Sequence, residues 1–211
     1  RMNELSSHDR AFIRPSSSGA QLGGLAKNTR LAMLLCEAAG YNTIMIETVG
    51  VGQGEIEIAQ LADVFTLALN PGGGDELQGI KRGIMEMADI IVVNKADGDA
   101  HRQAQLTAKE YSMALHLKPA NENGWIPKVI TASALEGQGI EAYWNQVFDF
   151  EREVTANGWK DEHRSRQMKY WAQKGIQDLL LAKLGNFQHL ITQGLEEGKL
   201  PEILAREIIK D

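Results

Sequence analysis

Short apolar runs, each followed by a polar or glycine-rich loop and a helical pattern, most strongly constrain how this chain can fold. The clearest run is Ile90–Val93, and similar runs cover 43–47, 64–69 and 128–131, with a shorter candidate at 11–14. Apolar runs of this length, bounded by turn residues, are typical of strands buried in a parallel sheet. Because helical patterns separate them, the sequence predicts a doubly wound, mostly parallel α/β sheet.

Apolar residues at helical spacing fill the segments between these runs. They predict helices over 25–39, 56–61, 77–87, 100–117 and 140–154. After residue 157 the strand patterns stop, and the remaining sequence predicts helices over 160–183, 187–194 and 200–210. We therefore expect a partial α/β domain over 1–157 and a C-terminal helical region over 158–211. The apolar stripes of the C-terminal helices either pack on the parent domain or form a subunit interface.

Composition excludes several classes of protein. The net charge of −6 leaves no basic excess to meet nucleic-acid phosphates, so we expect no nucleic-acid partner. The single cysteine, Cys36, cannot form an intrachain disulfide or a cysteine-built metal site. The apolar runs are too short to span a membrane, and no signal-peptide pattern is present. These features favour a cytosolic protein or a protein of an organelle matrix.

The tetrapeptide Asn94-Lys95-Ala96-Asp97 follows the run 90–93, at the strand end where doubly wound sheets bind their ligands. The Asp97 carboxylate can accept hydrogen bonds from the ring N–H and the amino group of guanine. Adenine offers neither group in that arrangement, so a buried Asp97 would stay unpaired against it. Lys95 can lay its alkyl stem along the base, and Asn94 can tie the loop to neighbouring backbone. The pattern favours guanine recognition, and an ordinary polar turn is the alternative.

Glu47 ends the predicted strand 43–47 and is followed by a glycine-rich loop. An acidic residue at the end of a buried strand needs a partner, which is either Mg²⁺ with its waters or a neighbouring Lys or Arg. Gly50 can bring its backbone N–H against a terminal phosphate because it has no side chain. Gln53 could position a water, although glutamine is also a common loop residue.

Two more loops follow predicted strands. Ser133-Ala134-Leu135 comes after the run 128–131, and its backbone N–H groups could contact the guanine carbonyl oxygen. Its strand is expected beside the strand 90–93, so the two loops should converge on one base.

The stretch 72–81 places three glycines and an acidic pair before a helix. Helix capping accounts for the acidic pair, and the extra glycines indicate a moving loop or a partner contact.

Taken together, these segments resemble one family. The resemblance rests on Arg1-Met2 and on residues 11–15, 34–40, 47–53, 73–81 and 94–99. These stretches are similar to the methylmalonyl-CoA mutase-associated P-loop GTPases, also named ArgK-type GTPases or LAO/AO transport system kinases. The likeness is strong over about positions 1–150 and looser in the helical tail.

The resemblance implies an incomplete P-loop GTPase-like fold that binds GTP or GDP and Mg²⁺. It implies a chaperone that loads and protects an adenosylcobalamin-dependent acyl-CoA mutase, and that forms a homodimer through its C-terminal helices. By this likeness Glu47 acts on Mg²⁺ through water, and Gly50 and Gln53 belong to a catalytic switch. Guanine recognition is carried by Asn94, Lys95, Asp97, Ser133, Ala134 and Leu135. A further switch that contacts the mutase matches Gly73, Gly74, Asp75, Glu76, Gln78 and Lys81.

One element of that family is absent from the sequence. The 211 residues contain no Gly-x-x-x-x-Gly-Lys-Ser/Thr motif, which would cradle the phosphates of a nucleotide. We therefore expect a fragment whose Walker A loop, with an acidic metal-site residue, lies upstream of Arg1. Two alternatives remain open. One is a non-catalytic module that binds a mutase or itself. The other is an ATP-dependent kinase of the amino-acid transport type, against which Asp97 argues.

Overall fold

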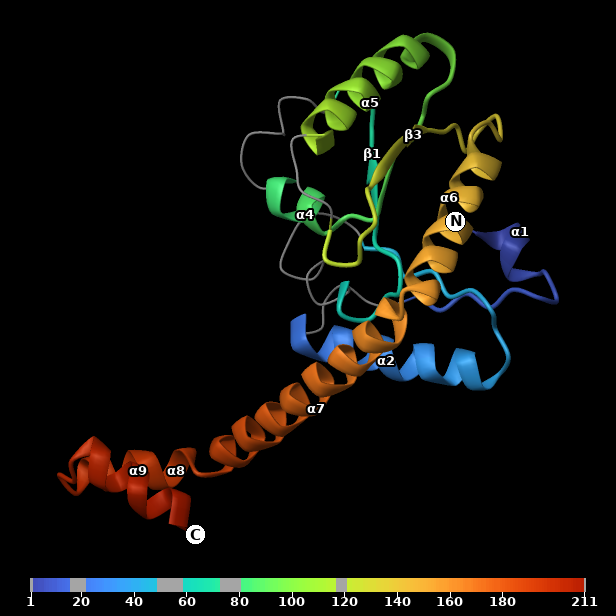
Figure 1. The fold of residues 1–211 in the computed structure, drawn as a ribbon. Helices are drawn as coiled ribbons and strands as arrows, with labels where there is room; N and C mark the ends of the chain where they lie inside the picture. The colour runs from blue at the N-terminus through green and yellow to red at the C-terminus, as the bar shows by residue number, and fades with distance from the viewer. Residues whose placement is uncertain (1, 16–21, 49–58, 73–80, 117–120, 211) are drawn as a thin grey trace. The chain divides into compact units, whose positions relative to one another are not determined.

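The computed structural model describes residues 2–15, 22–48, 59–72, 81–116 and 121–210. It divides into two compact units, Arg1–Lys160 and Asp161–Asp211. Among the described residues, the first unit holds the strands and the second holds only helices (Figure 1). The assignment of 1–157 and 158–211 to two functional domains stays a prediction.

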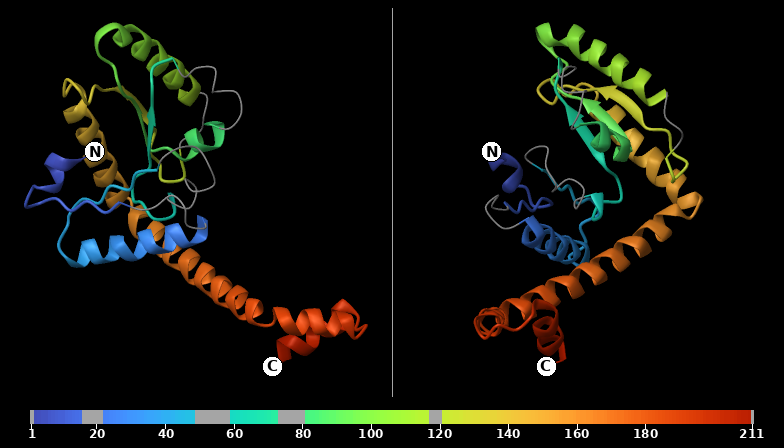
Figure 2. Two further views of the ribbon diagram at one scale, coloured as in Figure 1. Left: turned by 180° about the vertical axis from the view of Figure 1, so that it is seen from behind. Right: turned by 90° about the vertical axis from the view of Figure 1, so that its left-hand side faces the viewer.

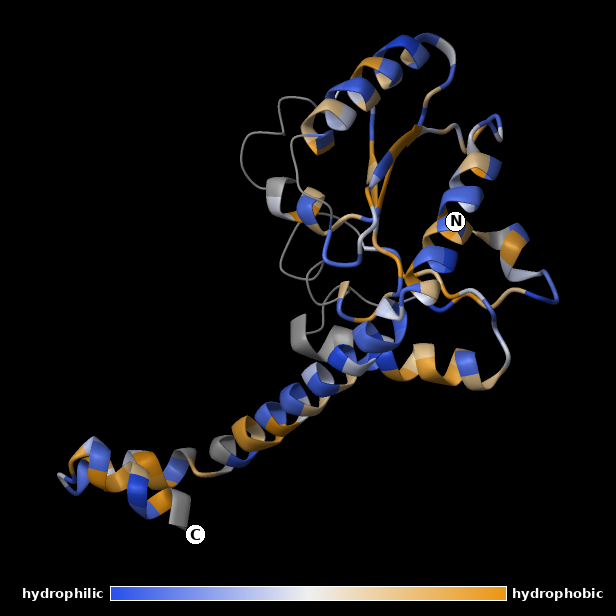
Figure 3. Cartoon of the chain, viewed as in Figure 1, coloured by the Kyte–Doolittle hydropathy of each residue, from blue (hydrophilic) through white to orange (hydrophobic). Residues whose placement is uncertain are grey.

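The centre of the first unit is a three-stranded sheet of order β1-β2-β3. Its strands are β1 Thr66–Leu69, β2 Ile90–Val93 and β3 Lys128–Thr131. All pairs are parallel and in step, with Thr66 opposite Ile90 and Ile90 opposite Lys128. The three strands fall within predicted runs, and the predicted parallel α/β class is confirmed. In Figure 3 much of the sheet is coloured hydrophobic, although part of β3 is hydrophilic, and the surrounding helices are of mixed colour.

The described part of the first unit also contains helices before, between and after the strands. In chain order they are α1 Asn3–Ser6, α2 Leu22–Ala38, α4 Lys81–Met87, the short 3₁₀ helix η2 Gly98–Ala100, α5 His101–His116 and α6 Ile140–Ala156. The second unit contains most of α7 Trp159–Asn186, then α8 Gln188–Glu196 and α9 Pro201–Lys210. Residues 56–58 of the predicted helix 56–61 lie outside the described residues, as do residues 77–80 of the helix predicted before β2.

The helices cover both faces of the sheet, because successive side chains of a strand point to opposite faces. Ile91 packs with Tyr111 of α5 on one face. Ile90 and Val92 pack with Tyr143 of α6 on the other. Figure 2 shows α5 and α6 on opposite sides of the strands. β2 is therefore buried from both sides, which explains why its sequence is apolar without alternation.

Two predicted strands are wrong. Residues 11–14 and 43–47 form no strand in the described structure, and Met45 is 75% exposed. An apolar segment becomes a strand only when a neighbouring strand pairs with its backbone groups. Among the described residues, no strand pairs with either segment. The expectation that Glu47 ends a buried strand is therefore also wrong, since Glu47 is exposed.

A buried acidic residue lies at the other end of the sheet, just before β2. The Asp89 carboxylate is 7% exposed and accepts hydrogen bonds from Phe65 N (2.9 Å) and Asn123 Nδ2 (3.1 Å). Trp125 Nε1 donates to the Asp89 carbonyl oxygen (2.8 Å), and Asn123 Oδ1 accepts from Trp125 N (2.9 Å). Burial raises the pKa of Asp89 from 3.8 to about 6, although the bonds from Phe65 and Asn123 oppose the rise.

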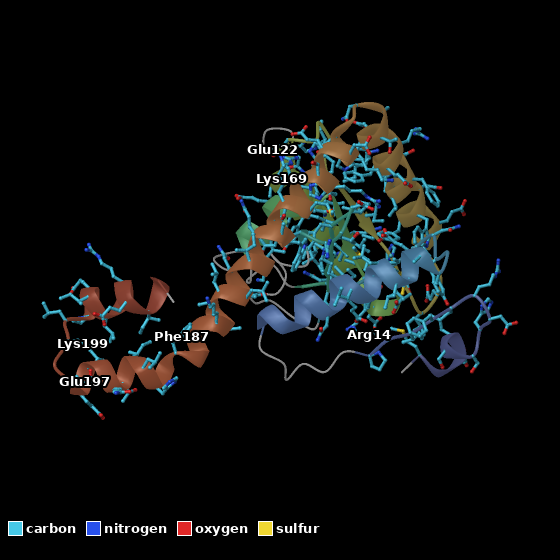
Figure 4. The ribbon with its side chains drawn as sticks, turned by 90° about the horizontal axis from the view of Figure 1, so that it is seen from below. Arg14, Glu122, Lys169, Phe187, Glu197 and Lys199 are labelled. Carbon is cyan, nitrogen blue, oxygen red and sulfur yellow. The ribbon has the colours of Figure 1, made fainter. Side chains whose placement is uncertain are left out.

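The second unit ends in a helical hairpin of α8 and α9. Leu204 of α9 is buried against Gly194 of α8, where a side chain larger than hydrogen would meet it. Lys199, in the turn, pairs with Glu207 (3.1 Å) and Glu197 (3.6 Å), and Figure 4 shows Lys199 and Glu197 side by side. Hydrogen bonding to Glu207 is the main reason that the pKa of Lys199 is raised. In the described parts of the chain, no helix combines the length and the apolar content needed to cross a membrane.

Candidate functional site

The loops after β2 and β3 lie side by side at the carboxyl edge of the sheet. Backbone hydrogen bonds continue past the strand ends, from Ala132 N to Val93 O (2.9 Å) and from Ala96 N to Ala132 O (3.0 Å). Asn94 N donates to Leu69 O (2.8 Å), which ties the first loop to β1 as well. Parallel strands bring their carboxyl ends to one edge, so the two sequence motifs meet there.

Asp97 is held by the second loop. Ser133 Oγ donates to Asp97 Oδ2 (2.5 Å) and accepts from Glu136 N (3.0 Å). Ser133 is fully buried, so this hydroxyl is committed to the protein. Asp97 precedes η2 but makes no capping hydrogen bond to it. Its carboxylate therefore links the loop after β2 to the loop after β3 and does not cap a local turn.

The neighbouring residues complete this arrangement. Asn94 Oδ1 accepts from Ala134 N (3.3 Å), so the N–H that we expected to face a base oxygen is turned toward Asn94. Lys95 has a φ of 59°, a left-handed conformation that a residue with a side chain adopts only where its surroundings hold it. Leu135 is 86% exposed at the tip of the second loop.

Gly139 closes the second loop. Ser133 N donates to Gln138 O (2.9 Å), and these two residues form an isolated antiparallel bridge. Gly139 has a φ of 75°, and a Cβ there would overlap the carbonyl oxygen of Thr131. Only glycine fits this close approach. The turn therefore fixes Ser133 under Asp97.

Ala96 is held at both of its backbone groups. Its N–H is bonded to Ala132, and its carbonyl oxygen lies 3.1 Å from His101 Nδ1. A carbonyl oxygen only accepts, so Nδ1 must carry a proton. The other ring nitrogen lies 2.9 Å from Gln105 Nε2 and accepts from it in the neutral ring.

This geometry suits a planar ligand that carries two adjacent N–H donors. Among the described residues, none donates to Asp97 Oδ1, and Oδ2 keeps a lone pair beyond its bond with Ser133. A guanine edge supplies such a pair of donors. The carboxylate that Ser133 holds therefore has the free acceptor positions that a guanine site requires.

The other predicted site residues are not brought to this place by the described structure. Glu47 is exposed and makes no ion pair with any described residue, so the alternative of a structural Lys or Arg partner gains no support. Lys81 begins α4. Gly50, Gln53, Gly73, Gly74, Asp75, Glu76 and Gln78 lie outside the described residues. Among the residues described, no cluster of three or more His, Cys, Asp or Glu forms a metal site. Mg²⁺ commonly takes only one or two carboxylates together with phosphate oxygens, so a lone Glu47 fits it chemically.

Three residues of the site were not found by sequence reasoning: Glu136, Gly139 and His101. The repeated glycines Gly137 and Gly139 were a signal for a tight turn after Ser133. No sequence signal marked the contact of His101 with Ala96, because a histidine at the start of a helix is usually solvated.

The parallel sheet, the helices on both of its faces and the converging loops define a GTPase-like α/β fold. The family model "Methylmalonyl Co-A mutase-associated GTPase MeaB" matches residues 1–188. The chain therefore belongs to this family. The crystal structure of an LAO/AO transport system kinase superposes with a TM-score of 0.74 at 35% identity, covering 100% of this chain and 68% of that one.

Relatives with curated names agree with the family. GTPase ArgK of Escherichia coli (strain K12) is 45% identical over 184 residues, which are 87% of this chain and 55% of that protein. The mitochondrial methylmalonic aciduria type A homolog of Mus musculus is 46% identical over 181 residues, 86% of this chain and 44% of that protein. The chain thus spans about half the length of the curated relatives it matches.

Proposed function

We propose that this chain belongs to a GTP-binding and GTP-hydrolysing protein that acts as chaperone for an adenosylcobalamin-dependent acyl-CoA mutase. In this role it gates the loading of the cobalamin cofactor and protects the mutase. Membership of the MeaB family supports the proposal, as do the printed names of the relatives. The observation that carries it is the Asp97 carboxylate, held by Ser133 at the carboxyl edge of the sheet.

Guanine is selected over adenine by this carboxylate. The ring N–H and the amino group of guanine donate to Asp97, while Lys95 covers one face of the base and Asn94 holds the two loops together. Ser133 acts through Asp97, because its hydroxyl is already engaged by Asp97 and Glu136. Adenine would leave Asp97 Oδ1 desolvated and without a donor, which costs about 1–3 kcal/mol once the base covers it.

Hydrolysis requires a metal ion and a positioned water. When bound, Mg²⁺ neutralises charge that develops on the phosphate oxygens. Glu47 would hold that ion through water, and Gly50 and Gln53 would form the switch that responds to the terminal phosphate. Replacing Glu47 with alanine should lower Mg²⁺-dependent GTP hydrolysis without unfolding the protein, because the side chain is exposed. Normal turnover in that variant, with an unchanged circular dichroism spectrum, would remove Glu47 from the mechanism.

The partner contacts are assigned to two other regions. The stretch 73–81 senses the nucleotide and touches the mutase. The protein dimerises through its C-terminal helices. Exposed leucines on α7 support the dimer, with Leu179 71% exposed and Leu180 and Leu181 also open. The protein acts in the cytoplasm of a bacterium or in the mitochondrial matrix.

A change of base specificity tests the function directly. Asp97→Asn replaces one carboxylate oxygen by an NH₂ group, which opposes the amino group of guanine but matches the 2-carbonyl of xanthine. We expect GDP to bind about 10- to 100-fold more weakly, from one mispaired buried group of about 1–3 kcal/mol, and XDP to bind more tightly. The protein expressed from the full-length gene should be titrated with both nucleotides. Unchanged GDP affinity in the variant would remove the guanine site.

The chaperone role needs a second measurement on the same protein. GTP hydrolysis should be followed with and without an adenosylcobalamin-dependent acyl-CoA mutase. A change in rate that is lost in Asp97→Asn supports the partnership. An absence of GTP hydrolysis with and without the mutase, together with mutase binding in the absence of nucleotide, would favour the non-catalytic binding module.

A further inference from the structure

The residue between Lys95 and Asp97 is held from two directions. Ala96 is buried, its N–H donates to Ala132 O (3.0 Å), and its carbonyl oxygen accepts from His101 Nδ1 (3.1 Å). A buried carbonyl group needs a hydrogen-bond partner, and His101 supplies it from the first position of α5.

The orientation of this carbonyl group matters for Asp97. The Ala96 carbonyl and the Asp97 N–H lie in one rigid peptide plane. Rotation of that plane therefore redirects the bond from Asp97 Cα to its side chain. The preceding residue, Lys95, is in the left-handed region with a φ of 59°. Such a conformation persists only where the surrounding contacts hold it.

We infer that His101 is a positioning residue for guanine recognition, which rests on the proposed function of Asp97. His101 does not touch the base. Its Nδ1–H fixes the Ala96–Asp97 peptide plane, and Ser133 fixes the carboxylate at the other end of the same residue. Two contacts therefore orient Asp97, and loss of either should reduce its selectivity for the guanine edge.

Variants at two positions separate this role from ordinary helix packing. His101→Ala removes the donor. His101→Asn restores an N–H at the same separation from Cβ as Nδ1, because the amide nitrogen of asparagine is a δ atom. Gln105→Ala is the matched control, since it removes only the contact on the other ring nitrogen. All proteins should be expressed from the full-length gene.

The first readout compares GDP with IDP, which lacks the amino group that donates to Asp97. We expect His101→Ala to bind GDP about 10-fold more weakly, the effect of one lost buried hydrogen bond. IDP should lose less, so the preference for GDP over IDP shrinks. His101→Asn should recover most of the preference, and Gln105→Ala should keep it. Equal losses for the two nucleotides, or wild-type values in His101→Ala, would overturn the inference.

The second readout needs no nucleotide. Hydrogen–deuterium exchange of the peptide covering 94–100 reports how firmly the Ala96 N–H is held. Exchange should speed up in His101→Ala and not in Gln105→Ala. If the variants show this exchange pattern but the wild-type protein binds neither GDP nor IDP, the positioning contact stands and the guanine function fails. If GDP binds and exchange does not change in His101→Ala, His101 has no positioning role.

Discussion

Replacing Asp89 with asparagine should change how the stability of the protein depends on pH. Burial raises the pKa of Asp89 from 3.8 to about 6, so the folded protein holds this proton more tightly than the unfolded chain does. The free energy of unfolding therefore falls as the pH rises through this range. Stability from a protonated Asp89 is fully present below about pH 4 and is lost above about pH 6.

The magnitude follows from the two pKa values. A separation of about two pKa units makes the ionised, buried carboxylate cost about 3 kcal/mol at neutral pH. Near pH 4.5 the same expression gives about 1 kcal/mol, so this residue alone changes stability by about 2 kcal/mol between pH 4.5 and pH 7.5. The asparagine side chain of the variant does not titrate and has no such dependence. It also opposes an NH₂ group to the N–H donors of Phe65 or Asn123, which costs about 1–3 kcal/mol at every pH.

The assay is urea unfolding of the wild-type protein and Asp89→Asn at several pH values, followed by tryptophan fluorescence. Every other titrating group is shared, so its contribution cancels in the difference between the two proteins. The wild type should lose about 2 kcal/mol relative to the variant as the pH rises from about 4.5 to about 7.5. Parallel stability curves would show that the hydrogen bonds from Phe65 and Asn123 balance burial, and a relative gain by the wild type would show that they outweigh it.

Two further substitutions test the geometry of the loops. Gly139→Ala should destabilise the protein by more than about 2 kcal/mol, since it combines a left-handed backbone with an overlap on the Thr131 carbonyl oxygen. Gly137→Ala, at a φ of 74° but with open space around it, should cost only about 1 kcal/mol, and equal thermal shifts for the two would refute the overlap. Ser133→Ala should weaken GDP binding by about 1–2 kcal/mol through loss of the bond to Asp97, as measured by isothermal titration, and unchanged affinity would show that Asp97 needs no support.

Sequence patterns predicted the parts of the fold that depend on residues near each other in the chain and on the burial of apolar side chains. β2 is apolar along its whole length because helices cover both of its faces. Its sequence therefore identified it as a buried strand without information about its neighbouring strands. The meeting of Asp97 with Ser133 also followed from a general rule, that parallel strands end at one edge of a sheet. The predicted strand over residues 43–47 was wrong, because strand formation there depends on pairing with another strand and not on the composition of the segment.

Such sequence patterns did not predict individual polar contacts. Asp89 directly precedes the apolar run 90–93 and no sequence pattern marked it, although its carboxylate meets Phe65 and Asn123, which are distant in the sequence. His101 contacts the carbonyl group of a loop that precedes it by five residues. Contacts of this kind depend on side-chain conformation and on backbone orientation, and neither leaves a periodic signal in the sequence.

The central claim is that Asp97 selects guanine, and competition between nucleotides tests it most directly. Labelled GDP should be bound to the full-length gene product in the presence of Mg²⁺ and then displaced with unlabelled GDP or ADP. The account predicts displacement by GDP and none by ADP at the same concentration, because adenine cannot satisfy the carboxylate. Equal displacement by the two nucleotides, or no binding of labelled GDP, would contradict it.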